Sequence, residues 1–312
     1  MFNMSTLRLL VQHVSFGLLT YGGRGGLFFG MSLPCFACPY VSGCGGYCYL
    51  MILQSRMALE MSLAEISLKG PSALSGLLLF LLLAILLGKS WCGWICPFGL
   101  VQDWLSIIRK KMGLRESVIS AEGHRKLSWI KYALLIYLII TPPLITAKIL
   151  HPDFNLPFCN ICPAKALMPI FAGETARLSL DVTNVVTAIY SGLLLTISGL
   201  MVAAMFFKER FFCLFCPMLA ILRLLRPLTL VRLSKNPASC IGCGNCRRAC
   251  PMDVEEVYRE RLSSEVQTGA CIGCFKCTEV CPSQGTLNVK LAKANLFSSS
   301  PGYVGKLKGL RW

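Results

Sequence analysis

The chain has 312 residues, of which 54% are hydrophobic and only 15% are charged, and it carries a net charge of +16 and 18 cysteines. A globular domain of this length would have about 25% charged residues, so much of the chain is expected to face lipid. A small secreted domain held by disulfides is excluded, because the chain is too long and too apolar for that class.

Four apolar stretches are predicted to cross a membrane as helices, each of which needs about 20 residues. They are residues 9–33, 70–88, 129–147 and 182–207. The second and fourth contain no charged residue, the third contains only Lys131, and the first is weaker because Arg24 lies within the run GGRGG. The sequence therefore predicts a mainly α-helical fold with a four-helix membrane domain over residues 1–232.

Lysine and arginine in the loops predict the orientation of these helices, because such residues concentrate on the cytoplasmic side. The 89–128 loop and the segment after residue 208 are rich in them, whereas 34–69 and 148–181 carry few. The N-terminus and both basic segments are therefore predicted to be cytoplasmic, in a multi-pass protein of the cell membrane. The charge then marks topology and contact with lipid head groups, so it requires no nucleic-acid partner.

A small α+β domain of the two-cluster bacterial ferredoxin type is predicted over residues 233–295, followed by a basic tail at 296–312. Two blocks there have the spacing C-x2-C-x2-C-x3-C-P, in which the fourth cysteine ligates the other cluster. The predicted ligands are Cys240, Cys243, Cys246 and Cys281 for one [4Fe–4S] cluster (the first set), and Cys271, Cys274, Cys277 and Cys250 for another (the second set). A structural zinc site would not need this doubled run of four cysteines.

A pair of cysteines follows every predicted span, at the start of an expected short helix. The pairs are Cys44 and Cys48, Cys92 and Cys96, Cys159 and Cys162, and Cys213 and Cys216. Gln54 and Gln102 each follow the second cysteine of a pair by six residues. Because successive spans run in opposite directions, the pattern predicts a repeat of inverted topology.

The predicted orientation sorts these pairs into two sets. Cys92, Cys96, Cys213 and Cys216 (the third set) fall at the cytoplasmic face, where four thiolates suffice for a third cluster. Cys44, Cys48, Cys159 and Cys162 (the predicted outer set) fall at the outer face and either hold a fourth cluster or form disulfides. Cys35 and Cys38 are left over: they form a redox dithiol, form a disulfide, or replace Cys44 and Cys48 as ligands.

This order of motifs resembles the NapH type of membrane ferredoxin, the membrane subunit of the quinol dehydrogenase that feeds periplasmic nitrate reductase. The likeness rests on WCGWICPFGLVQDWLSIIRKKMG at 91–113, FFCLFCPMLAILRLLRPL at 211–228 and the two ferredoxin blocks. The resemblance implies that electrons pass from menaquinol toward periplasmic acceptors, with the third set and the ferredoxin domain in the cytoplasm. The outer cysteines and the two-residue gap between Cys213 and Cys216 depart from that family.

The sequence thus predicts an electron-transfer subunit of an oxidoreductase complex, with a soluble ferredoxin or menaquinol as donor or acceptor. Electrons would pass between the cytoplasmic ferredoxin domain and an outer-face iron–sulfur centre or partner subunit. One alternative is a menaquinol dehydrogenase subunit with structural outer cysteines, and another is an exporter of reductant that uses the outer CxxC pairs. The hydrocarbon core is about 30 Å thick, so the cysteine-bearing segments dip into it, or a quinone or partner cofactor bridges the gap.

Overall fold

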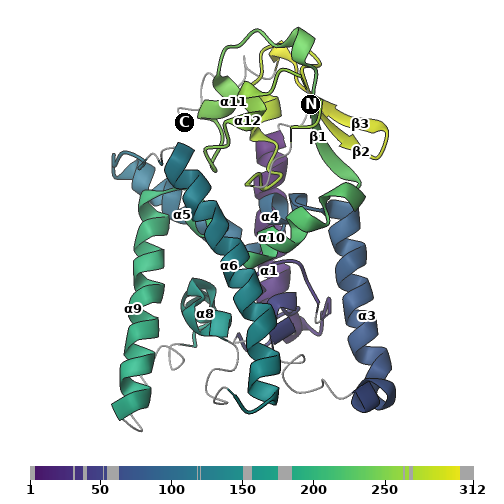
Figure 1. Cartoon of the computed structure of the whole chain (residues 1–312). Helices are drawn as coiled ribbons and strands as arrows, with labels where there is room; N and C mark the ends of the chain where they lie inside the picture. The colour runs from purple at the N-terminus through teal and green to yellow at the C-terminus, as the bar shows by residue number, and fades with distance from the viewer. Residues whose placement is uncertain are drawn as a thin grey trace.

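The computed structural model describes residues 4–30, 32–37, 41–51, 53–54, 63–117, 119, 121–149, 157–174, 185–262, 264–266 and 270–302. This part of the chain is mainly helical and contains a three-stranded antiparallel sheet. Figure 1 shows the sheet and its short helices at one end of a group of long helices.

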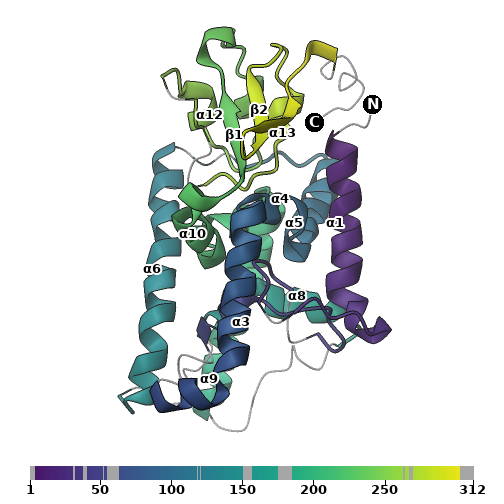
Figure 2. The ribbon, with the colours of Figure 1, turned by 90° about the vertical axis from the view of Figure 1, so that its right-hand side faces the viewer.

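Four long helices extend away from the sheet and surround several shorter ones (Figures 1 and 2). They are α1 (Met4–Tyr21), α3 (Leu63–Leu87), α6 (Ala121–Thr146) and α9 (Val185–Phe207). Large apolar side chains on these helices point outward, including Leu78, Ile136 and Leu200, which are 58%, 57% and 66% exposed. Large apolar patches of this kind on an outer surface mark a site of contact with another apolar surface, either a protein or a membrane.

One helical run among the described residues, Glu122–Ile145 in α6, is long and apolar enough to cross a membrane. Two other apolar runs, Ser75–Leu87 in α3 and Ser191–Phe207 in α9, are shorter. The predicted repeat of four spans therefore stays a prediction.

The first predicted span, residues 9–33, differs from the helix in the structure. Helix α1 ends at Tyr21 and a 3-10 helix, η1 (Gly22–Gly25), follows. Glycine is a poor helix former, and Gly26 has φ +76°, a left-handed conformation in which glycine is favoured. The run GGRGG therefore ends the helix, and the chain turns back between the long helices.

Short helices fill the space between the four long ones. They are α4 (Ser90–Trp94), α5 (Pro97–Lys111), α7 (Pro157–Ile161), α8 (Pro163–Phe171), η4 (Phe211–Leu214), α10 (Pro217–Leu224) and η5 (Arg226–Leu228). Helices α5, α8 and α10 each begin with a proline directly after a cysteine, namely Cys96, Cys162 and Cys216. Proline suits the first helical position, and the unpaired N–H groups of the first turn favour a thiolate beside them.

The strands and the last helices form a small unit, here called the C-terminal domain (residues 231–302). It contains β1 (Val231–Lys235), η6 (Pro237–Ser239), α11 (Asn245–Arg248), α12 (Glu256–Arg259), α13 (Lys276–Glu279), β2 (Leu287–Leu291) and β3 (Ala294–Ser298). Strand β2 pairs with β1 and β3, with Val231 opposite Leu291. The domain boundaries predicted after residues 232 and 295 fall inside β1 and β3. The paired strands extend beyond the positions at which the composition of the sequence changes.

A network of buried charges joins the C-terminal domain to the long helices. Glu209, two residues after the end of α9, accepts hydrogen bonds from Lys276 at 2.9 Å and Lys110 at 3.4 Å. Its neighbour Lys208 pairs with Asp253 of the C-terminal domain at 2.6 Å. Burial alone would raise the pKa of Glu209, but Lys276 and Lys110 hold that pKa well below its ordinary value.

Replacing Glu209 with glutamine is expected to lower the free energy of unfolding by about 3–5 kcal/mol, because two lysines lose their buried partner. Since the pKa is depressed, the carboxylate stabilises the fold above about pH 4.3, and this stabilisation is lost as the pH falls further. In thermal unfolding experiments in detergent, the unfolding temperature of the wild type should fall more steeply between pH 7 and pH 3 than that of Glu209→Gln.

Glu122→Gln is the control, because Glu122 pairs with Lys126 on the surface and is 66% exposed. Such an exposed pair contributes at most about 1 kcal/mol. Equal pH dependence of the wild type and Glu209→Gln would contradict the assigned role of Glu209.

Candidate iron–sulfur sites

The first set rings a cavity in the C-terminal domain. The cavity is lined by Cys240, Cys243, Cys246 and Cys281 and by the side chain of Lys235, among other residues. Lys235 is 3% exposed, and its ammonium donates to three backbone carbonyl oxygens at 2.7–3.1 Å. A buried cation beside four thiols suits a cluster whose thiolates give it net negative charge, so these residues fit a [4Fe–4S] cluster.

The thiols of the second set lie close to one another in the same domain. Burial raises the pKa of Cys277 well above its ordinary value, and the Cys274, Cys271 and Cys250 thiolates raise it further. The backbone N–H groups of Val254 and Gly273 donate to the sulfurs of Cys250 and Cys271, both at 3.4 Å. Such N–H···S bonds are among the interactions that tune cluster potentials.

Helix α4 lies against the second set with backbone touching backbone. A Cβ atom at Gly93 would come within 2.8 Å of the Cys274 Cα, and one at Gly273 within 2.7 Å of the Ser90 nitrogen. The Trp94 indole N–H donates to the Gly273 carbonyl at 3.2 Å. Glycine at both positions therefore brings α4, which carries a cysteine of the third set, next to the second set.

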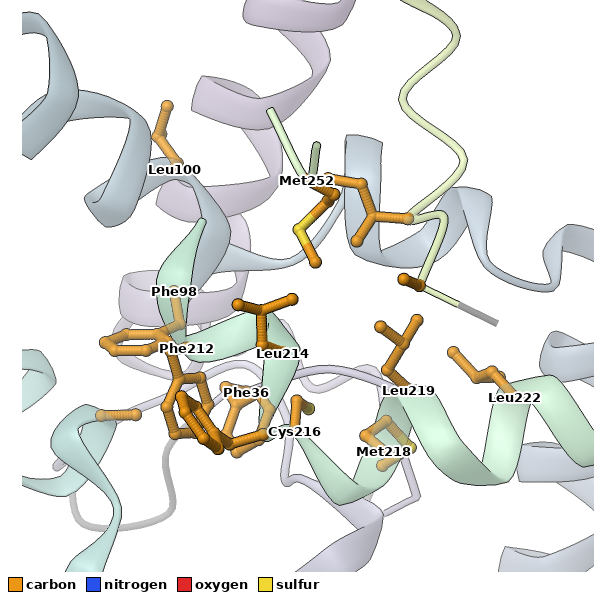
Figure 3. Close-up of a cluster of buried hydrophobic side chains, with 14 of the residues drawn as sticks. Phe36, Phe98, Leu100, Phe212, Leu214, Cys216, Met218, Leu219, Leu222 and Met252 are labelled. Atoms are coloured by element: carbon orange, nitrogen blue, oxygen red, sulfur yellow. The ribbon is translucent and has the colours of Figure 1, made fainter. Parts of the chain in front are cut away.

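The third set lines a cavity between the short helices. The lining includes Cys92, Cys96, Cys213 and Cys216, together with Cys35. The rings of Phe36, Phe98 and Phe212 lie beside Cys216 (Figure 3). Four thiols around one enclosed apolar space fit a cluster shielded from water.

A buried arginine, Arg210, neutralises charge beside the third set. It is 1% exposed and donates to both carboxylate oxygens of Asp103, at 2.7 and 2.6 Å, and to the Cys92 carbonyl at 3.2 Å. Gly99 makes room for it, since a Cβ there would be 2.1 Å from an Arg210 nitrogen. Burial raises the pKa of Cys213 to about 11, and the Arg210 charge opposes this rise.

The sequence analysis missed the pair of Arg210 and Asp103. The available signal was that Asp103 is the only acidic residue between Glu65 and Glu116, in an otherwise apolar and basic segment. An isolated carboxylate in such surroundings is expected to have a buried basic partner, although the sequence alone does not identify which one.

The outer cysteines gather in a combination that differs by one residue from the predicted outer set. Burial raises the pKa of Cys48, and so do the neighbouring thiolates of Cys159, Cys35 and Cys162. Cys35, Cys48, Cys159 and Cys162 are therefore called the fourth set. For Cys44, burial raises the pKa and backbone hydrogen bonds oppose this rise, and no thiol of the described residues contributes. Cys38 lies outside the described residues.

Backbone pairing explains why Cys35 lies next to Cys48. Leu33 forms a parallel bridge with Cys48, and the Cys48 N–H donates to the Ala37 carbonyl at 3.1 Å. These contacts hold the segment that contains Cys35 alongside Cys48. They depend on tertiary structure, so the spacing of the cysteines could not reveal them.

The third and fourth sets are neighbours, whereas the sequence analysis placed them at opposite faces of the membrane. Cys48 contributes to the raised pKa of Cys216, and Cys96 to that of Cys35. The Phe36 ring centroid lies 5.4 Å from that of Phe212, which precedes Cys213. It lies 6.3 Å from that of Phe158, which precedes Cys159. The cysteine-bearing segments thus turn inward between the long helices, one of the two arrangements that the sequence analysis allowed.

The described cysteines, 17 in number, are all free thiols in the structure. Within the described residues, no three Cys, His, Asp or Glu side chains converge tightly enough to bind one metal ion.

Two protein families match the segments that carry these cysteines. The family described as "4Fe-4S binding domain" matches residues 70–115 and 189–236, which contain the third set. The family described as "4Fe-4S dicluster domain" matches residues 232–282, which contain the first and second sets. The chain thus contains 4Fe-4S binding domains, and the resemblance to the NapH type stays a prediction.

Three known proteins are similar to the chain. The protein of Escherichia coli named "Putative electron transport protein YccM" is 26% identical over 68% of this chain and 56% of its own length. Two uncharacterized proteins of Methanocaldococcus jannaschii, MJ0750 and MJ0749, are 25% and 26% identical over 60% and 56% of this chain, and over 70% and 56% of their own lengths. The chain therefore spans little more than half of the Escherichia coli relative. No solved structure matches the chain.

Replacing Arg210 with methionine is expected to lower the free energy of unfolding by about 3–5 kcal/mol, because Asp103 becomes an unpaired buried charge. The double variant Arg210→Met with Asp103→Asn should regain part of that stability, since it leaves neither charge unpaired. Thermal unfolding of the single and the double variant measures the difference in stability between them. The surface variant Arg223→Met is the control, and a double variant no more stable than the single one would argue against the pair.

Proposed function

We propose that this chain is an electron-transfer subunit of the cell membrane that holds four [4Fe–4S] clusters in a row. The observation that carries the proposal is that each thiol set lies near the next. The Cys246 thiolate of the first set raises the pKa of Cys277 in the second, α4 with Cys92 of the third set lies against Cys274, and the Cys48 thiolate of the fourth set raises the pKa of Cys216. When bound, such clusters supply one-electron oxidation and reduction without bond-making chemistry. The similarity to a relative named for electron transport supports this function.

The protein's own groups would hold and insulate the clusters. Cysteine thiolates of the four sets are the proposed ligands, with Cys35 in place of Cys44. Phenylalanine rings between the third and fourth sets exclude water, while Arg210 and Lys235 offset negative charge. These residues thus support stable clusters at depths where an uncompensated charge would be costly.

A position in the membrane is supported by the outward-facing apolar side chains of α3, α6 and α9. The basic 89–128 loop and the basic segment after residue 208 lie at the same end as the C-terminal domain (Figure 2). By the preference of basic residues for the cytoplasm, this end faces the cytoplasm and the fourth set lies toward the outer side.

The first set is the proposed exchange point with a soluble redox partner. Cys243 is exposed, and the adjacent Ile241 is 69% exposed. The surrounding surface is basic, with Arg247 and Arg248 directly after Cys246. An acidic, ferredoxin-type protein is the partner that this surface suits, because complementary charge steers association.

Counting iron tests the proposal. Anaerobically purified protein should contain about sixteen irons and as many acid-labile sulfides per chain, since each cluster has four of each. Cys35→Ala should lower the iron count to about twelve, whereas the matched variant Cys44→Ala should leave it at about sixteen. About twelve irons in the wild type, with outer thiols that react with an alkylating reagent, would exclude the fourth cluster and favour the exporter of reductant.

A menaquinol dehydrogenase subunit is the second candidate, and it is favoured by a cavity of about 560 Å³ between α1, α4 and the C-terminal domain. The volume lies in the range of about 300–1,000 Å³ that small-molecule sites occupy. Its lining is almost entirely apolar and includes Leu7 and Val11 of α1, Trp94 of α4 and Phe275 of the C-terminal domain.

One residue that lines this cavity, Ser90, has a polar side chain that could bind a quinone carbonyl. The Ser90 hydroxyl is buried, and among the described residues it has no hydrogen-bond partner. Ser90 precedes Cys92 by two residues, and its backbone lies against Gly273 beside the second set. A quinone whose carbonyl oxygen accepted a hydrogen bond from this hydroxyl would therefore lie close to both the second and the third set.

A fluorescent quinol analogue, 2-heptyl-4-hydroxyquinoline N-oxide, tests this second candidate by the quenching of its emission on binding. Ser90→Ala is expected to weaken binding about five- to tenfold, the cost of about one hydrogen bond. Val11→Trp fills the cavity and should abolish binding, whereas Val14→Trp, on the exposed side of α1, should not change it. Unchanged affinity in the first two variants would exclude a quinone site in this cavity.

A further inference from the structure

Two buried glutamines make the same set of hydrogen bonds in two different places. Gln102 donates from Nε2 to the Cys213 sulfur at 3.7 Å and accepts at Oε1 from the Phe212 N–H at 3.2 Å. Gln54 donates to the Cys159 sulfur at 3.6 Å and accepts from the Phe158 N–H at 3.1 Å.

The likeness extends to the backbone of each glutamine's own helix. Nε2 of Gln102 also donates to the carbonyl four residues earlier, at 3.5 Å, and Nε2 of Gln54 does the same at 2.9 Å. Each glutamine is 1% exposed, and each follows a cysteine of its own set, Cys96 or Cys48, by six residues. The third and fourth sets are therefore built on one repeated unit of cysteine, glutamine and an aromatic residue next to a second cysteine.

An N–H group directed at a cysteine sulfur interacts more strongly as that sulfur becomes more electron-rich. In a thiolate-ligated cluster the sulfurs gain electron density on reduction, so such a donor stabilises the reduced state and raises the reduction potential. The other amide atoms of each glutamine are engaged by the backbone, which fixes the direction of the N–H toward sulfur.

We propose that Gln102 and Gln54 are matched positioning residues that each raise the reduction potential of one cluster, in the third and the fourth set respectively. This inference rests on the proposed function, because it requires a cluster in each of these sets. The two glutamines would let the reduction potential of each of these two clusters be adjusted separately, without a change in any ligand.

The test replaces each glutamine with methionine, which has similar volume and no N–H donor. In redox titrations followed by EPR, Gln54→Met should shift one cluster's oxidised-to-reduced equilibrium about tenfold toward oxidation, which is about 59 mV for one electron. Gln102→Met should shift a different cluster and leave the first unchanged. Thr141→Val is the control, since Thr141 is equally buried and bonds only to a carbonyl of its own helix.

The possible results separate this inference from the proposed function. Full iron content with unmoved potentials would overturn the inference alone, and the glutamines would then serve only to hold the backbone. A wild type that lacks the fourth cluster would overturn the proposed function and the role of Gln54 with it.

A measurement on the unaltered protein covers the case in which the variants fail to fold. With 15N in the glutamine side-chain amides, pulsed EPR of the reduced clusters should detect coupling to 15N at two of them. Absence of this coupling would overturn the inference.

Discussion

The inward turn of the chain after each long helix is the constraint on which the rest of the structure depends. Each turn leads into a short helix, and three of these begin at Cys96-Pro97, Cys162-Pro163 and Cys216-Pro217. In apolar surroundings every backbone N–H needs a partner, and the first turn of a helix has several that lack one within the helix. N–H groups of two of these first turns, those of Phe98 and Gly99 beside Cys96 and that of Leu219 beside Cys216, lower the pKa of the thiols against the effect of burial, so they favour a thiolate at the start of the helix.

Buried positive charge lies beside three of the four thiol sets. Lys235 lies beside the first set and Arg210 beside the third, while Lys89, 2% exposed, lies near Cys271 of the second. Burial lowers the pKa of Lys89 to about 8, and the nearby Cys271 thiolate opposes that shift. The basic residues that the sequence analysis assigned to topology and to contact with lipid head groups therefore also include buried residues placed near individual sulfurs.

The parts of this arrangement that depend on local spacing were predictable, and those that depend on distant contacts were not. The ferredoxin-type spacing predicted two sets of thiols in the C-terminal domain, and in the structure the members of each set lie near one another. Hydropathy gave the order of the long helices but not the depth of the segments between them, so the third and fourth sets were expected far apart. Cys35 lies beside Cys48 because of a bridge at Leu33, a contact with no sequence signature.

The close contacts of Gly93 with Cys274 and of Gly273 with Ser90 limit how the C-terminal domain can move. Many electron carriers swing between docking positions on a flexible linker, and their turnover then depends on diffusion of the moving part. Here β1 follows η5 after two residues, and the Leu230 N–H donates to the Ile85 carbonyl of α3 at 2.8 Å. With no side chain at either glycine and only two residues in the connection, the C-terminal domain is held in one position against α4. In the proposed function, a soluble redox partner would therefore have to reach the domain, which does not swing toward it.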